Sequence, residues 1–363
     1  MLYYILYSLH ESYSVFNVFK YITFRTAYAV LTAFLISLFM GPWVIRKLKE
    51  YQIGENIRED GPRSHITKTG TPTMGGILII ISLFIPTILW ADIKNIYILL
   101  IIFSTIGFGL IGFADDYLKV ARKRSLGLGA KEKFVVQISI ALCIAIVLIY
   151  LIPERASYAT KLGIPFFKEV RPDIGLFYIP FVMLVVVGAS NAVNLTDGLD
   201  GLAIGPIIIA TAAYTAIIYV SGHYNFANYL DIQYVKGAGE VTIFCGAILG
   251  ASLGFLWFNT YPAQIFMGNV GSLALGGALG TIAVISKHEL ILILIGGLFV
   301  IEALSVIMQV VYFKLSKGRR IFRMAPLHHH FEEKGWEEPK VIVRFWIIAL
   351  VLALLALSTL KLR

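Results

Sequence analysis

The sequence predicts an all-α polytopic membrane protein with about ten transmembrane helices. Of its 363 residues, 58% are hydrophobic and only 15% are charged, whereas soluble proteins carry about 25% charged residues. The mean hydropathy is +0.79. A helix needs ~20 mostly apolar residues to cross the hydrocarbon core of a bilayer, and segments of this kind recur along the whole chain.

Ten segments are apolar enough to be predicted spans, and the fifth and eighth are the shortest. The ten cover approximately residues 24–43, 74–91, 96–113, 134–152, 174–190, 202–220, 241–258, 272–286, 290–313 and 341–360. The gaps between them hold no long soluble stretch, so we expect residues 1–363 to form a single integral-membrane domain. Residues 1–23 lack the basic start and the small-residue cleavage site of a signal peptide.

The distribution of Lys and Arg predicts the orientation in the membrane. An even number of spans places both termini on one side. Nineteen of the 31 Lys and Arg lie in the loops at about 44–73, 114–133 and 314–340, and ten lie on the opposite side. Cytoplasmic loops are enriched in Lys and Arg. We therefore expect these loops to be cytoplasmic, together with 191–201 and 259–271, and both termini to be external.

The external side is predicted to carry a small hairpin at about 153–173. The net charge of +9 needs no nucleic-acid partner, because basic cytoplasmic loops are usual in membrane proteins. In the seventh span, Gly246, Gly250 and Gly254 recur every four residues. They share one helix face, where a second helix can approach closely.

Two carboxylates, Asp115 and Asp116, close the third predicted span. A carboxylate at the centre of a bilayer costs at least ~2.5–3.5 kcal/mol, so this pair must lie at the water edge or meet cations. Lys119 is four residues after the first and three after the second, within reach if the helix continues. The pair is either an ordinary interfacial charge cluster or a magnesium or general-base site.

A second polar run covers residues 191–201, where side chains with amides and carboxylates recur every three residues. At 3.6 residues per turn, such a row drifts by about 60° per step and forms no single stripe on a helix. The run suits a turn that leads into the sixth span. Because it contains no Lys or Arg, its carboxylates need a ligand, a metal or distant cations unless the loop is simply solvated. The residues are Asn191, Asn194, Asp197 and Asp200, with Gly198 and Gly201 supplying backbone freedom.

Four lysines are predicted on the same side as these acids: Lys68, Lys119, Lys131 and Lys133. Mg²⁺ takes oxygen ligands from one or two carboxylates together with substrate phosphates. Lysine supplies point charges to the remaining phosphate oxygens. Acids and lysines beside glycine-rich turns therefore favour a site for Mg²⁺ and a diphosphate substrate.

Three consecutive histidines, His328, His329 and His330, lie before the last span. Their spacing and the lack of nearby Cys argue against a zinc site, and contact with phosphate or sugar is the better interpretation. In the ninth span, Glu302 and Gln309 are seven residues apart and share a helix face. A glutamate inside a span must find a partner or a polar cavity.

Together these residues resemble the phospho-N-acetylmuramoyl-pentapeptide-transferase family, within the polyprenyl-phosphate N-acetylhexosamine-1-phosphate transferase superfamily. The resemblance runs nearly end to end. The aspartate motifs are typical of the superfamily, and the histidine triplet is typical of the muramoyl-pentapeptide branch. The matching segments are Gly70–Gly76, Asp115–Tyr117, Asn191–Gly201, Phe258–Ala263, Phe266–Leu273 and Ala325–His330.

The resemblance implies a homodimeric, multi-pass enzyme of the bacterial cytoplasmic (inner) membrane with its active-site cleft on the cytoplasmic face. It implies transfer of phospho-MurNAc-pentapeptide from UDP-MurNAc-pentapeptide to undecaprenyl phosphate, which gives lipid I and UMP in peptidoglycan synthesis. It also implies a requirement for Mg²⁺.

The resemblance assigns roles to individual residues. It implies a uridine pocket at Gly198, Leu199, Asp200 and Phe266, and a nucleotide-substrate cleft at Lys68, Asn194 and Asp197. It implies phosphate contacts from Lys119 and Lys131 and substrate contacts from His328 and His329. We add Asn191, Asn259 and Gln309 as predicted substrate-binding residues. The predicted catalytic residues are Asp115, Asp116, Asn269 and His328, and the predicted metal-binding residues are Asp116 and Asn269.

One position departs from the family pattern. The family has Asp where this chain has Asn269, and that Asp is the expected magnesium ligand. An amide offers only a neutral oxygen, which is a poorer partner for a hard dication. The sequence therefore predicts a protein that folds and binds nucleotide but turns over slowly.

Other interpretations remain open at this point. A sister transferase that uses a different UDP-N-acetylhexosamine is the nearest alternative, followed by an ion-coupled transporter and a non-catalytic binding scaffold. Direct attack of the lipid phosphate on the substrate is the preferred mechanism, and a two-step route through an aspartyl intermediate is the second. The sequence does not divide the acid and base roles between Asp115 and Asp116.

Overall fold

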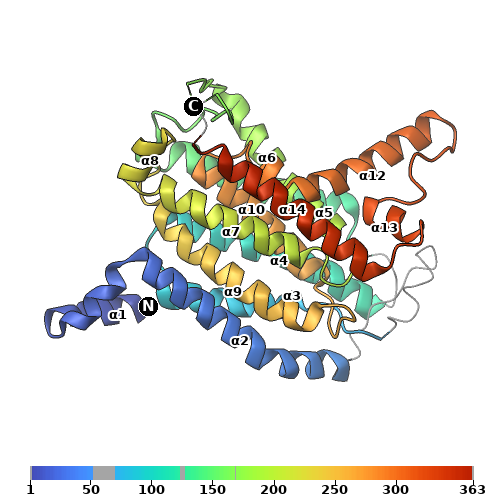
Figure 1. The fold of residues 1–363 in the computed structure, drawn as a ribbon, viewed down its shortest axis with the longest axis horizontal. Helices are drawn as coiled ribbons and strands as arrows, with labels where there is room; N and C mark the ends of the chain where they lie inside the picture. Colours follow the sequence, from blue (N-terminus) through green and yellow to red (C-terminus); the bar gives the residue numbers. More distant parts are fainter. Residues whose placement is uncertain (1, 52–69, 123–126, 168, 362–363) are drawn as a thin grey trace.

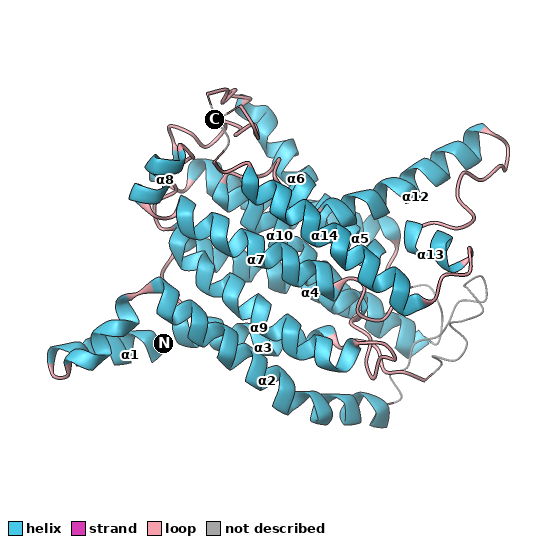
Figure 2. Ribbon diagram, in the orientation of Figure 1, coloured by secondary structure: helices cyan, strands magenta, loops and turns pink. Residues whose placement is uncertain are grey.

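The structure is a computed structural model that describes residues 2–51, 70–122, 127–167 and 169–361. Within these ranges the regular structure is helical apart from isolated bridge residues; one antiparallel bridge joins Lys161 to Asp173, inside the segment predicted as a hairpin (Figure 2). The predicted all-α class is confirmed.

Nine of the ten predicted spans correspond to one helix each, and the ninth in order is divided between two. Nine helices of the described residues are long and apolar enough to cross a membrane, and α3, with 15 residues, is shorter. At 1.5 Å per residue α3 is about 22 Å long, against a hydrocarbon core of about 30 Å. The long helices and α3 are α2 (Ile22–Glu50), α3 (Gly76–Trp90), α4 (Ile96–Arg122), α5 (Ala130–Tyr150), α6 (Tyr178–Thr196), α7 (Ile204–Ser221), α9 (Val241–Asn259), α10 (Gly268–Ser286), α12 (Gly297–Leu315) and α14 (Glu338–Ser358).

Short helices connect or flank the long ones. They are α1 (Leu2–Ser8), α8 (Tyr224–Leu230), α11 (Leu292–Ile295) and α13 (Leu327–Glu332). The ninth predicted span is broken at Gly296, so that it comprises α11 and α12. Helices α4 and α6 extend beyond their predicted ends, because the end of an apolar run marks the edge of the hydrocarbon and backbone hydrogen bonding continues past it.

Helix α10 forms the centre of the bundle, between α4 and α6 (Figure 1). Every residue from Val270 to Ser286 is buried. A Cβ atom added at Gly277 would lie 2.7 Å from Phe108 of α4, and one added at Gly280 would lie 2.8 Å from the backbone of Val186 in α6. The small residues of α10 therefore allow both neighbours to pack directly on its backbone.

The external end of α10, as predicted from the charge distribution, is held by buried cations. Arg155 is fully buried and donates hydrogen bonds to the carbonyls of Ile285 at 2.9 Å and Val284 at 3.2 Å. Lys287 donates to the Ala159 carbonyl at 3.0 Å. Burial lowers the pKa of Lys287 to about 8. Cations at the last carbonyls of a helix are favourable, so these contacts fix this end of α10.

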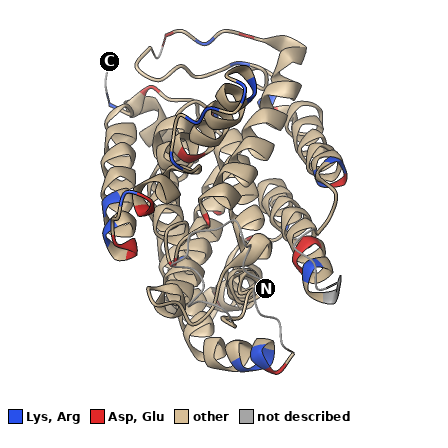
Figure 3. Cartoon of the chain, turned by 90° about the vertical axis from the view of Figure 1, so that its right-hand side faces the viewer, with Lys and Arg blue, Asp and Glu red and all other residues tan. Residues whose placement is uncertain are grey.

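The two ends of the bundle differ. Both termini and α8 lie toward one end, and α13 lies at the other (Figure 1). Figure 3 faces the end that carries α13 and shows Lys, Arg, Asp and Glu at helix ends and in loops of the bundle. The assignment of this end to the cytoplasm stays a prediction from the Lys and Arg count.

The predicted close approach at Gly246, Gly250 and Gly254 is confirmed, and α2 is the neighbouring helix. A Cβ atom at Gly250 would lie 2.1 Å from the carbonyl oxygen of Val30. That oxygen belongs to the α2 backbone and cannot move aside without moving the helix.

We predict that Gly250→Ala destabilises the protein, because α2 and α9 would have to separate. Overpacking of this kind typically costs about 1–3 kcal/mol. Gly188→Ala is the matched control, since a Cβ at this helical glycine of α6 meets no atom within 4 Å. Thermal unfolding in detergent should show a lower midpoint for Gly250→Ala alone. Equal midpoints for the two variants would contradict the packing argument.

Candidate active site

The carboxylates of Asp115 and Asp116 lie near the C-terminal end of α4 and are almost fully buried, with 2% and 5% exposure. Lys119 Nζ lies 2.7 Å from Asp115 Oδ2 and 3.5 Å from Asp116 Oδ1. The predicted contact is confirmed because α4 continues to Arg122. One ammonium therefore faces two buried carboxylates.

A second cation reaches Asp115 from α5. Lys133 Nζ lies 3.1 Å from Asp115 Oδ2, and the backbone N–H of Leu128 donates to Asp115 Oδ1 at 2.8 Å. Lys131 is the predicted phosphate ligand of this segment; its side chain is exposed and does not contact Asp115 in this structure, and its role toward phosphate stays a prediction. Lys131 and Lys133 are two positions apart, and side chains two positions apart on a helix point about 200° from each other. Only one of these two lysines can therefore face Asp115. The helical register, which the sequence alone left open, selects Lys133.

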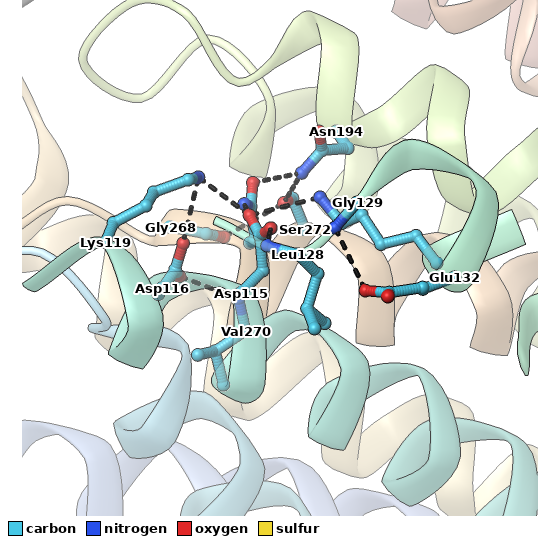
Figure 4. A network of polar contacts seen from close by, with 12 residues as sticks. Asp115, Asp116, Lys119, Leu128, Gly129, Glu132, Asn194, Gly268, Val270 and Ser272 are labelled. Atoms are coloured by element: carbon cyan, nitrogen blue, oxygen red, sulfur yellow. Dashed lines mark hydrogen bonds and ion pairs between the residues drawn. The ribbon is translucent and has the colours of Figure 1, made fainter. Parts of the chain in front are cut away.

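The N-terminus of α10 completes the cluster (Figure 4). Asn269 Nδ2 donates to Asp115 Oδ2, and Asn194 Nδ2 donates to Asn269 Oδ1 at 2.6 Å. The backbone N–H of Val270 donates to Asp116 Oδ2 at 3.3 Å. A Cβ at Gly112 would lie 2.2 Å from the Asn269 carbonyl oxygen, so a glycine in α4 is what allows α10 to begin beside these acids.

The donor atoms gathered here suit a hard cation. They are the oxygens of the two carboxylates and Oδ1 of Asn269. In the described part of the chain, no three acidic, His or Cys side chains form a group that could hold a metal. Mg²⁺ is commonly held by one or two carboxylates together with substrate phosphates. The residues therefore fit Mg²⁺ that shares its coordination with a substrate, with Asn269 offering a neutral oxygen.

The turn after α6 is tied to the segment after α9. Asn259 is 3% exposed; its Oδ1 accepts from the Gly201 N–H at 3.0 Å, and its Nδ2 donates to the Ile265 carbonyl at 2.8 Å. Asp200 Oδ2 accepts from the Ala263 N–H at 2.9 Å. These two predicted binding residues therefore hold one loop against the other.

The histidines form pairs with nearby residues. His328 is fully buried, and its Nδ1 lies 3.2 Å from Glu302 Oε2, so Glu302 has the partner that its place in a span demands. His329 Nδ1 lies 2.7 Å from Glu332 Oε2. His330 Nδ1 accepts from the Arg323 N–H at 3.0 Å. Burial, followed by the nearby charges of Lys334 and Arg323, lowers the pKa of His330, which suits its role as an acceptor.

Comparison with known proteins places the chain in a family. The pattern of glycosyl transferase family 4 matches residues 96–287, and signature 1 of phospho-N-acetylmuramoyl-pentapeptide-transferase matches residues 68–80. The phospho-N-acetylmuramoyl-pentapeptide-transferases of Desulforapulum autotrophicum and Desulfatibacillum aliphaticivorans are 61% and 59% identical to the chain, with complete coverage of both proteins in each comparison. That of Desulfosudis oleivorans is 60% identical, again over the full length.

The chain belongs to the phospho-N-acetylmuramoyl-pentapeptide-transferase family. It is thus a multi-pass bacterial membrane protein of a transferase family, as the apolar helices and the full-length relatives together show.

The remaining residues predicted for this transferase lie as follows. Asn191 Nδ2 donates to Gln137 Oε1 of α5 at 2.8 Å. Gln309 Oε1 accepts from the N–H groups of Ile321 and Phe322, at 3.1 and 3.0 Å, and so supports the loop before α13. Asp197 is the half-buried C-cap of α6.

Leu199 and Phe266, both predicted to line the uridine pocket, differ in burial. Leu199 is 4% exposed and packs in an apolar cluster with Leu298 and Phe345, so its side chain contributes to the core. Phe266 is half-buried, and its backbone bonds to Pro72 and Gly75 at 2.8 Å each. Lys68 lies outside the described residues.

We predict that Lys133→Gln destabilises the protein and that Lys131→Gln does not. Removing one partner of a buried charged group costs about 1–3 kcal/mol, and Asp115 would keep a single ammonium. Thermal unfolding in detergent measures the difference. In a double-mutant cycle, Asp115→Asn should abolish most of the effect of Lys133→Gln. Equal effects of the two lysine substitutions would show that Lys133 has no special contact.

Proposed function

We propose that this transferase moves phospho-MurNAc-pentapeptide from UDP-MurNAc-pentapeptide to undecaprenyl phosphate and releases UMP. Full-length relatives at 56–61% identity carry the name of that activity. The observation that carries the proposal is the cluster in which Asp115 meets Lys119, Lys133 and the start of α10. A diphosphate substrate and a phosphate acceptor require this combination of cations, helix N–H groups and carboxylates.

The proposed reaction is a direct displacement. An oxygen of the lipid phosphate attacks the β-phosphorus, the bond from that phosphorus to the bridging oxygen breaks, and UMP leaves with the bridging oxygen and its electron pair. A phosphate monoester has a second pKa of about 6, so the nucleophile is already mostly dianionic at neutral pH. Neutralising the approaching anions is then the larger task.

The residues of the cluster support that task. Lys119 and Lys133 supply positive charge beside Asp115. The N-terminus of α10 adds the partial positive charge of a helix dipole and has no acidic residue in its first turn. Asp115 orients these groups. Because it already contacts two ammoniums and an amide, its carboxylate is a poor nucleophile, which favours the direct route over an aspartyl intermediate.

We propose Mg²⁺ as the cofactor, held by Asp116, Asn269 Oδ1 and substrate phosphates. When bound, it neutralises the charge that develops on the diphosphate oxygens. The Asn269 amide contributes no negative charge, and its Nδ2 already bonds to Asp115. We therefore propose that this chain binds Mg²⁺ weakly and turns over slowly.

We propose a homodimer in the cytoplasmic membrane, with the α13 end of the bundle in the cytoplasm. The dimer rests on family resemblance, and the mass of the protein in defined detergent measures it. A monomeric mass in detergent and in lipid nanodiscs would refute it. The sidedness rests on the Lys and Arg count, and labelling of cysteines placed in α8 and α13 from either side of the membrane measures it.

We predict that Asn269→Asp raises the rate of Mg²⁺-dependent UMP release by about tenfold or more, because a carboxylate replaces a neutral ligand. Without Mg²⁺ the same variant should unfold at a lower temperature, since the new charge faces Asp115, and Mg²⁺ should stabilise it more than the parent chain.

Asn228→Asp is the matched control, because it adds the same charge on exposed α8 at the other end of the bundle. Asn228→Asp should change neither the rate of UMP release nor the unfolding temperature with or without Mg²⁺. A parent chain as active and as responsive to Mg²⁺ as Asn269→Asp would refute the role of position 269.

A sister transferase with a different sugar is the alternative. Competition between UDP-GlcNAc and UDP-MurNAc-pentapeptide separates the two, since only the true substrate should compete at low concentration. An ion-coupled transporter holds its carboxylates near the middle of the membrane, whereas Asp115 and Asp116 lie close to the end of α4. Their placement supports surface chemistry over transport.

A further inference from the structure

Glu302 and His328 form a fully buried pair outside the carboxylate cluster. Both side chains are 0% exposed. Glu302 Oε2 lies 3.2 Å from His328 Nδ1, and Glu302 Oε1 accepts from the His328 backbone N–H at 3.2 Å. The Glu302 carboxylate of α12 thus contacts both the backbone N–H and the ring Nδ1 of His328, the first histidine of α13.

The contact with Glu302 favours one tautomer of the His328 ring. An ionised carboxylate only accepts hydrogen bonds, so its contact with Nδ1 requires a proton on that nitrogen. In a neutral ring, Nε2 is then a bare acceptor. A carboxylate that bonds one ring nitrogen commonly fixes the role of the other in this way.

The other nitrogen is aimed at the turn after α6. His328 Nε2 is buried and has no hydrogen-bond partner. A Cβ added at Gly198 would lie 2.3 Å from it, so the ring occupies the space of a side chain at Gly198. Buried polar atoms are nearly always bonded. A hydrogen-bond donor on a molecule that binds at this turn would satisfy Nε2.

We propose that Glu302 is a positioning residue that holds His328 as the Nδ1–H tautomer, so that Nε2 accepts a hydrogen bond from a hydroxyl or amide N–H of the bound nucleotide-sugar. The identity of that ligand rests on the proposed function. The tautomer does not, and it can be measured in the resting protein.

Glu302→Gln tests this pairing with almost no change in size. The Gln amide has one acceptor and one donor end, but His328 presents two donors. The backbone N–H cannot give up its proton, whereas the ring can move its proton from Nδ1 to Nε2. The amide oxygen then meets the backbone, the NH₂ meets Nδ1, and Nε2 becomes a donor.

The measurement is ¹⁵N NMR of protein labelled at its seven histidines, at pH 8. The signal that disappears in His328→Asn is that of His328. Calorimetry measures the affinity for UDP-MurNAc-pentapeptide. We expect the parent chain to show Nδ1–H and Glu302→Gln to show Nε2–H, with affinity weakened by about tenfold or more. Ser305→Ala, which removes a buried hydroxyl bonded to the Glu302 carbonyl, should keep the tautomer and stay within about twofold in affinity.

Three results would overturn the proposal: a parent ring protonated on Nε2, an unchanged tautomer in Glu302→Gln, or unchanged affinity despite a changed tautomer. Glu302→Asp guards against loss of folding, because it keeps an ionised acceptor and should keep the Nδ1–H form. Failure of the proposed function would look different. The nucleotide-sugar would bind, but neither the parent nor Asn269→Asp would release UMP.

Discussion

The burial of Asp115 and Asp116 is the constraint on which the rest of this end of the molecule depends. Two carboxylates that are 2% and 5% exposed at the end of an apolar helix need compensation. Lys119 of α4, Lys133 of α5 and the first residues of α10 supply it. Because each contact comes from a different element, satisfying the charges also fixes the relative positions of the three helices.

Helix α10 connects the carboxylate cluster to the opposite end of the bundle. Its small residues admit α4 and α6 against its backbone, and no polar side chain of its buried length faces lipid. Its far end is held by Arg155 and Lys287. A rod fixed at both ends keeps its N-terminal N–H groups in place, so the site needs little reorganisation when an anion binds.

Residues that look like ligands in the sequence divide into two kinds in the structure. Asn259, Asp200 and Gln309 have bonds to backbone groups of neighbouring loops, and they shape the site by holding those loops. Asn194 differs, because its amide reaches Asn269 and Ser272 at the acid cluster. Some of the polar side chains at this end of the bundle thus hold neighbouring loops together, and others reach the acid cluster. Only their contacts in the structure distinguish the two roles.

The three histidines of the triplet also differ from one another in their contacts. Its three members have different surroundings: His328 is fully buried against Glu302, His329 pairs with Glu332 on its own short helix, and His330 accepts a backbone bond. Three adjacent residues on a helix point about 100° apart, so one repeated residue type meets three separate environments.

The sequence by itself determined the fold class, the ten helical segments and the contact between Asp115 and Lys119, because these depend on hydrophobic length and on spacing along one helix. It also indicated the family. Tertiary structure decided the rest. Whether Lys131 or Lys133 meets Asp115 depends on the rotation of α5, and the pairing of Glu302 with His328 joins residues from two helices. Such contacts are set by how the helices pack against one another, and a one-dimensional pattern carries no record of that rotation.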